Sequence, residues 1–157
     1  MNSCSFFGHR TTVVSNETKQ KIKNVIENLI KIENYEIFYF GEFGDFDDVC
    51  YEIVSEIKLT YPNIKRVYVA TNDKALLKHK RICIKTYEEQ ITLPLTFEWW
   101  YQIIYYRNLA IIDNSNFVVF YVENEQNSGA NKALRYAIKT KKQHINLAIS
   151  PNTIKSI

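Results

Sequence analysis

The spacing of apolar residues along the chain predicts alternating strands and helices. Continuous apolar runs are typical of buried strands, whereas apolar positions at i, i+3, i+4 and i+7 are typical of one helix face. On this basis we predict strands at 3–8, 35–40, 67–70, 117–122 and 145–149. We predict helices at 18–33, from Asp45 to just before Tyr61-Pro62, at 97–113, and from Ser128-Gly129 to about Lys142.

The sequence also predicts one helix cap and the residues that share a face in two of the helices. Asp45 is the predicted N-cap of the second helix, because a carboxylate there accepts from free amides of the first turn. In the last helix, the apolar spacing directs four residues inward: Ala133, Leu134, Ala137 and Ile138. In the helix at 97–113, four residues share one side: Trp99, Trp100, Ile103 and Ile104.

Residues 71–97 show no regular pattern. A basic segment there leads to Ile82-Cys83-Ile84, which is a candidate short strand. The segment that follows, through Pro94, is predicted to be a loop.

Alternating strands and helices are typical of an α/β protein, in which helices cover both faces of a mostly parallel central sheet. The chain has 157 residues and no evident linker or repeat, so we predict a three-layer sandwich and a single domain over 1–157. Ligands of such sheets bind outside the carboxyl ends of the strands.

The composition bears on the cellular compartment and the class of partner, but it does not identify a ligand. The net charge of +3 is too small to indicate nucleic acid by itself. The three cysteines show no metal-ligand spacing and are interpreted as buried thiols in a reducing cytoplasm. No leader peptide or membrane-spanning run is visible, so we expect a cytoplasmic protein without a membrane partner.

The four glycines all fall at the carboxyl edge of the predicted sheet. Gly8, Gly41 and Gly44 follow strands, and Gly129 opens a helix. Turns alone could place them there, but a ligand that approaches the backbone closely explains the clustering better. Neither a Gly-x-Gly-x-x-Gly motif nor a P-loop is present, and we predict no metal, no cofactor and no catalytic residue.

Four segments at this edge supply candidate ligand-binding residues. In the first, Gly8 precedes His9 and Arg10, a basic pair suited to an anion. In the second, Asp45 and Asp47 could accept hydrogen bonds from ribose hydroxyls. The third and fourth segments contribute Arg107 with Asn108, and Ser128 with Gly129 and Ala130 at a helix N-terminus that could seat a phosphate. For each segment, helix capping or an ordinary solvated surface remains the alternative.

These segments resemble, in order, motifs of the SLOG superfamily and particularly of its YpsA-like branch. The first segment reads Cys4-Ser5-Phe6-Phe7-Gly8-His9-Arg10, similar to Cys-x-Phe-x-Gly-His-Arg, and the second reads Gly41-Glu42-Phe43-Gly44-Asp45, with Glu42 where that branch has a second glycine. Further matches are Tyr106-Arg107-Asn108, Ile112-Asp113-Asn114-Ser115, Ser128-Gly129-Ala130 and Tyr136-Ala137. The resemblance implies a Rossmann-like domain that binds a nucleotide or ADP-ribose-like ligand, as a non-catalytic sensor or sequestering module.

Two other functions remain open. Relatives in that superfamily, the LOG phosphoribohydrolases, cleave N-glycosidic bonds with a Glu on the first turn of the last helix, and that position here is Ala133. An N-glycosidase would therefore need another carboxylate, from Glu123 or Glu125 on the preceding loop or from Asp45 or Asp47. DprA-like DNA-binding proteins share the superfamily, and 65–85 and 132–142 are rich in Lys and Arg. The aromatic pairs Trp99-Trp100 and Tyr105-Tyr106 suggest a homodimer or higher oligomer.

Overall fold

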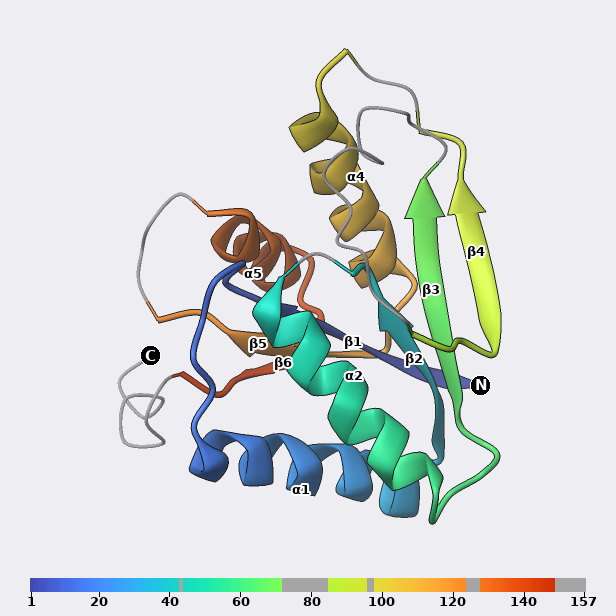
Figure 1. The fold of residues 1–157 in the computed structure, drawn as a ribbon. Helices are drawn as coiled ribbons and strands as arrows, with labels where there is room; N and C mark the ends of the chain where they lie inside the picture. The colour runs from blue at the N-terminus through green and yellow to red at the C-terminus, as the bar shows by residue number, and fades with distance from the viewer. Residues whose placement is uncertain (43, 72–84, 96–97, 124–127, 149–157) are drawn as a thin grey trace.

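A six-stranded parallel sheet forms the centre of the computed structural model, in the order β4-β3-β2-β1-β5-β6 (Figure 1). The structure describes residues 1–42, 44–71, 85–95, 98–123 and 128–148. The strands are β1 (Asn2–Gly8), β2 (Tyr35–Phe40), β3 (Lys65–Thr71), β4 (Glu89–Leu93), β5 (Phe117–Tyr121) and β6 (Gln143–Asn146). The helices are α1 (Asn16–Glu33), α2 (Asp45–Lys58), α4 (Trp100–Asp113) and α5 (Gly129–Lys139).

Helices cover both faces of the sheet, with α1 and α2 on one side and α4 and α5 on the other (Figure 1). Alternation along β1 builds both layers, because successive side chains of a strand point to opposite faces. Phe6 packs in the core below α1 and α2, and Phe7 packs in the core below α4 and α5. The predicted three-layer α/β sandwich is confirmed.

The strand order reverses between β1 and β5, so the loops that follow these two strands lead away from each other. From β1 the chain moves outward through β2 and β3 to β4, then returns to β5 on the other side of β1. The loops after β1 and β5 therefore lead to helices on opposite faces of the sheet. A parallel sheet has its ligand crevice at such a switch point.

Most of the predicted elements are present, with two differences in the strands. Glu89–Leu93 was predicted to be a loop, but it is strand β4 and pairs in parallel with β3. Its side chains are largely exposed at the sheet edge, so no apolar pattern marks it. Strand β6 begins at Gln143 and ends at Asn146, earlier than predicted. The candidate strand Ile82-Cys83-Ile84 lies outside the described residues.

Two positions in the helices differ from the predictions. Ile138 is 56% exposed although it was predicted to face inward, whereas Ala133 and Ala137 are buried as predicted. Asp45 is not an N-cap, because Gly44 takes that position and Asp45 is the first helical residue.

Cys4 and Cys50 are buried free thiols, as predicted. Burial raises the pKa of both thiols above the ordinary cysteine value. No helix among the described residues is both long enough and apolar enough to cross a membrane.

Candidate functional site

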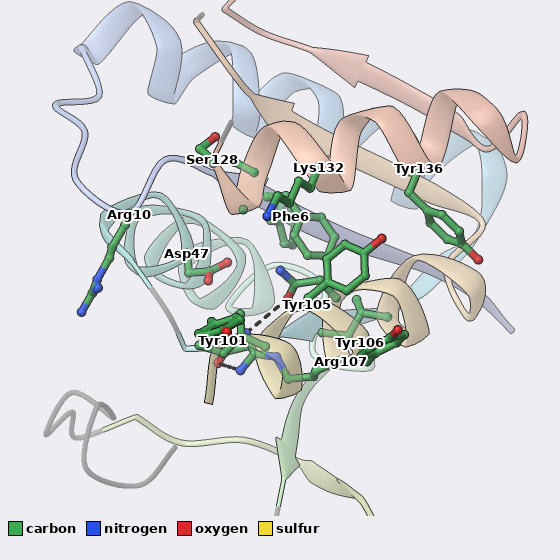
Figure 2. Close-up of a pocket in the computed structure, with 18 of the residues that line it drawn as sticks. Phe6, Arg10, Asp47, Tyr101, Tyr105, Tyr106, Arg107, Ser128, Lys132 and Tyr136 are labelled. Atoms are coloured by element: carbon green, nitrogen blue, oxygen red, sulfur yellow. Dashed lines mark hydrogen bonds between the residues drawn. The ribbon is translucent and has the colours of Figure 1, made fainter. Parts of the chain in front are cut away.

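A cavity of about 820 Å³ lies beyond the carboxyl end of β1, where the strand order reverses. Its walls come from the loop after β1, the ends of β2 and α2, and the facing sides of α4 and α5 (Figure 2). Most of the predicted ligand-binding residues line it: Gly8, His9, Arg10, Gly41, Asp47, Arg107, Asn108, Ser128, Gly129 and Ala130. The fold thus brings together residues from segments that are far apart in the sequence.

Gly44 and Asp45, which were also predicted to bind ligand, do not line this cavity. The Asp45 amide donates to the Arg10 carbonyl at 2.9 Å, and the Asp45 carboxylate accepts from the Thr12 amide at 3.3 Å. A Cβ at Gly44 would lie 3.0 Å from the Arg10 Cα, and the φ of Gly44 is +135°. These two residues hold the loop after β1 against the start of α2, which places Arg10 at the cavity rim.

Arg107 is the buried cation of the site, with 3% of its surface exposed. Its Nη1 donates to the Gly41 carbonyl at 2.8 Å, and its Nη2 donates to Asn108 Oδ1 at 3.3 Å. Its Nε has no hydrogen-bond partner within the described part of the chain. Burial lowers the pKa of Arg107, and the negative charge of Asp47 opposes that shift. Arg107 is thus a fixed guanidinium that lines the cavity and keeps one donor without a partner among the described residues.

Glu42 lies beside this cation in an uncommon backbone conformation. Its φ is +54°, in the left-handed region that favours glycine, and its carboxylate accepts from the Tyr87 hydroxyl at 2.9 Å. Glu42 is 7% exposed, and its negative charge acts to raise the pKa of Arg107. A carboxylate thus stands at a position whose backbone would suit glycine.

The N-terminus of α5 supplies main-chain donors to the cavity. Ser128 is the N-cap, and its Oγ accepts from the Asn131 amide at 3.1 Å. The Lys132 amide donates to the Ser128 carbonyl, so the Gly129 and Ala130 amides are the first-turn donors without an acceptor inside the helix. Those amides and the helix dipole favour an anion at this point.

His9 joins the two loops that border the crevice. Its Nε2 accepts a hydrogen bond from the Glu123 amide at 3.0 Å. This contact links the loop after β1 to the loop after β5. His9 therefore braces the cavity entrance.

The glycines at this edge have a simpler explanation than a ligand. A Cβ at Gly8 would overlap the Phe46 side chain, and one at Gly41 would lie 2.7 Å from Arg107 Nη2. With Gly44, three of the four glycines are required by contacts within the protein. Gly129 differs, because a Cβ there would meet nothing within 4 Å. Only that glycine leaves open space for a ligand.

Sequence reasoning missed two sets of lining residues, which come from the facing sides of α4 and α5 (Figure 2). The aromatic set on α4 is Trp100, Tyr101, Tyr105 and Tyr106. The set on α5 is Lys132, Arg135, Tyr136 and Lys139. Helical spacing was the available signal, because positions three, four and seven apart share a face.

Of the two basic segments in the sequence, 65–85 and 132–142, the first has its described cations in ion pairs. Lys65 pairs with Glu89, Arg66 with Glu88, and Lys85 with Asp48, each at 2.6 Å. The remaining cations of that segment lie outside the described residues. The described part therefore consists of ion pairs rather than an unneutralised basic surface.

The fold and the cavity define an α/β protein of Rossmann-like type with a small-molecule-sized cavity at its switch point. No protein-family model matches the chain, and no curated protein sequence matches it. Among solved structures, the chain is similar to the Moco Carrier Protein from Chlamydomonas reinhardtii, with a TM-score of 0.54 and 15% sequence identity. The match covers 98% of this chain and 80% of that protein. At this identity the likeness shows the shared fold alone.

Proposed function

We propose that the protein binds a nucleotide-derived anion in this cavity and releases it unchanged, as a sensor or a sequestering module. The observation that carries the proposal is Arg107, a buried guanidinium that lines the cavity and whose Nε has no hydrogen-bond partner among the described residues. Burying a cation is costly unless it serves a partner, and a phosphate oxygen is a suitable acceptor. We also propose that the chain is a YpsA-like member of the SLOG superfamily.

Several residues in and beside the cavity have separate roles in this proposal. Arg107 and the Gly129 and Ala130 amides bind one phosphate, and Arg10 approaches it from the rim. Asp47 accepts from a ribose hydroxyl. Asp45 acts indirectly, because its amide holds the Arg10 carbonyl. The tyrosines of α4 offer flat apolar surfaces for a base.

A structural relative named as a carrier protein supports binding rather than turnover. The residue at the position of the catalytic Glu of LOG enzymes, Ala133, also supports binding without turnover. Ala133 is 2% exposed and packs in the core below α5, so no acid is available there. The N-glycosidase alternative keeps one supporting observation, which is that the Asp47 carboxylate lines the cavity.

The deciding experiment is a thermal-shift panel with AMP, ADP, ATP, GTP, NAD, ADP-ribose and cyclic nucleotides, followed by chromatography of the recovered ligand. A ligand at 100 times its Kd adds about 2.7 kcal/mol to the free energy of unfolding. We expect a hit that is recovered intact. Recovery as free base and sugar phosphate would instead support the N-glycosidase, and no shift with any nucleotide would overturn the proposal.

A matched pair of variants locates the binding. Arg10→Ala removes an exposed cation that lines the cavity, and Lys19→Ala removes an exposed cation from α1. A charge-assisted phosphate contact contributes about 1.5–3 kcal/mol, so we expect weaker binding only in Arg10→Ala. Equal affinity in the two variants would remove Arg10 from the site.

A further inference from the structure

The cavity extends along α5 beyond the phosphate seat at its N-terminus. Lys132, Arg135 and Lys139 line it, and all three are exposed. Their i, i+3, i+7 spacing places them on one helix face, over a length of about 10 Å at 1.5 Å per residue. One wall of the cavity is therefore a row of cations that begins beside the helix N-terminus.

The opposite wall, on α4, is aromatic. Tyr101 and Tyr105 are four residues apart and share a face, and they are 54% and 38% exposed. Figure 2 shows Tyr105 between α4 and the helix that carries Lys132. The Tyr136 hydroxyl donates to Asp113 Oδ1 at 2.7 Å, which ties α5 to α4. The cation row and the aromatic wall are thus held together by a contact outside the proposed phosphate seat.

The charges of this cavity exceed what one phosphate neutralises. Among the described lining residues, five are cationic and one, Asp47, is a carboxylate. A phosphate monoester carries about −1.5 to −2 charges at pH 7. A single phosphate at Arg107 and the α5 N-terminus leaves the cations further along α5 without an anion, whereas a chain of phosphates meets them in turn.

We propose that the ligand is a nucleoside polyphosphate, with its phosphate chain along α5 and its base against Tyr101 and Tyr105. This inference rests on the proposed function and narrows its ligand. In it, Arg135 and Lys139 bind the outer phosphates and do not contact a monophosphate.

Calorimetric titration with AMP, ADP and ATP at constant ionic strength, without added Mg²⁺, tests the inference. We expect the Kd to tighten by about 5–10-fold with each added phosphate, which corresponds to about 1–1.4 kcal/mol per phosphate. The double variant Arg135→Gln and Lys139→Gln should weaken ATP binding by at least ~10-fold and change AMP binding by less than ~2-fold. Lys141→Gln is the matched control, because Lys141 is exposed just after α5 and does not line the cavity.

The outcomes separate this inference from the proposed function. Tight AMP binding with equal affinity for ATP would overturn the polyphosphate inference and leave nucleotide binding in place. Binding of inorganic triphosphate as tightly as ATP would overturn the role of the aromatic wall. Tighter, steeply salt-dependent binding of a single-stranded DNA oligomer would overturn the inference in favour of nucleic acid. No binding of any nucleotide would overturn both proposals.

Discussion

Arg107 and Gly41 fit together in one corner of the cavity, where Arg107 Nη1 donates to the Gly41 carbonyl at 2.8 Å. A Cβ at Gly41 would lie 2.7 Å from Nη2 and 2.9 Å from Cζ of the same guanidinium. The glycine therefore leaves the space that the buried cation occupies, and its carbonyl fixes the cation there. The orientation of Arg107, and so of its free Nε, depends on a residue that itself has no side chain.

Gly41→Ala should displace the Arg107 guanidinium. We expect the free energy of unfolding to fall by about 1–3 kcal/mol, because a buried cation loses its hydrogen bond. Nucleotide affinity should fall as well, because the Nε donor moves. Urea denaturation measures the first effect and calorimetry the second. Unchanged stability and affinity would show that Arg107 moves without cost, and would contradict the role of Gly41 in fixing its position.

Gly129→Ala provides the contrasting case at the other side of the cavity. A Cβ there meets nothing within 4 Å of the protein, so we expect stability to be unchanged or slightly raised. A phosphate on the Gly129 amide would be crowded by the added methyl group, so affinity should fall although stability does not. A variant with full affinity would exclude close contact between a ligand and this helix N-terminus.

The fold could be predicted from the sequence because its core strands are apolar throughout. Val118, Val119 and Phe120 have no exposed surface in β5, and a continuous apolar run marks them directly. Strand β4 could not be predicted, because an edge strand with exposed side chains needs no apolar pattern. Its pairing with β3 is set by position in the sheet, which local sequence does not encode.

The sequence predicted the helix N-terminus at the candidate site, but it did not predict the side chains of α4 and α5 that line the cavity. The sequence placed Ser128 at the N-terminus of the last helix, with helix capping as the alternative to a phosphate site, and Ser128 is the N-cap of α5. Trp99-Trp100 and Tyr105-Tyr106 were interpreted as an oligomer interface, which stays a prediction. Trp100, Tyr105 and Tyr106 also line the cavity, because α4 packs beside α5. Arg135 and Lys139 of α5 line it for the same reason, and no sequence motif links the two helices.

Glu42 and Tyr87 should form an energetically coupled pair. Tyr87→Phe removes the donor to the Glu42 carboxylate, and we expect a loss of about 1.5–3 kcal/mol in the free energy of unfolding. Glu42→Gly loses that same hydrogen bond but relieves a left-handed backbone, which costs about 1–2 kcal/mol for a side-chain-bearing residue. Its net change should therefore be smaller.

A double-mutant cycle by urea denaturation measures this coupling. In the Glu42→Gly background, Tyr87→Phe should cost little, because its acceptor is already absent. Equal costs of Tyr87→Phe in both backgrounds would mean that the hydrogen bond contributes nothing.

Glu88 should make the protein sensitive to acid. Its carboxylate accepts from the Arg66 amide at 2.7 Å and from the Arg66 guanidinium at 2.6 Å and 3.1 Å. Burial raises the pKa of Glu88, but the hydrogen bonds and charges of Arg66 and the charge of Lys58 outweigh it and lower the pKa from 4.5 to about 2. The ionised form is therefore bound more favourably in the folded state than in the unfolded chain.

A carboxyl group with a lowered folded-state pKa stabilises the protein above its unfolded pKa, and that stability is lost as pH falls through the folded value. We therefore expect the free energy of unfolding to decrease more steeply between pH 4.5 and 2 in the wild type than in Glu88→Gln. The difference should be about 1–2 kcal/mol, because partial exposure weakens the pair. Glu89→Gln is the control, since it removes a carboxylate from the more exposed pair with Lys65. Identical pH profiles for wild type and Glu88→Gln would show that the Arg66 contacts do not stabilise the folded state.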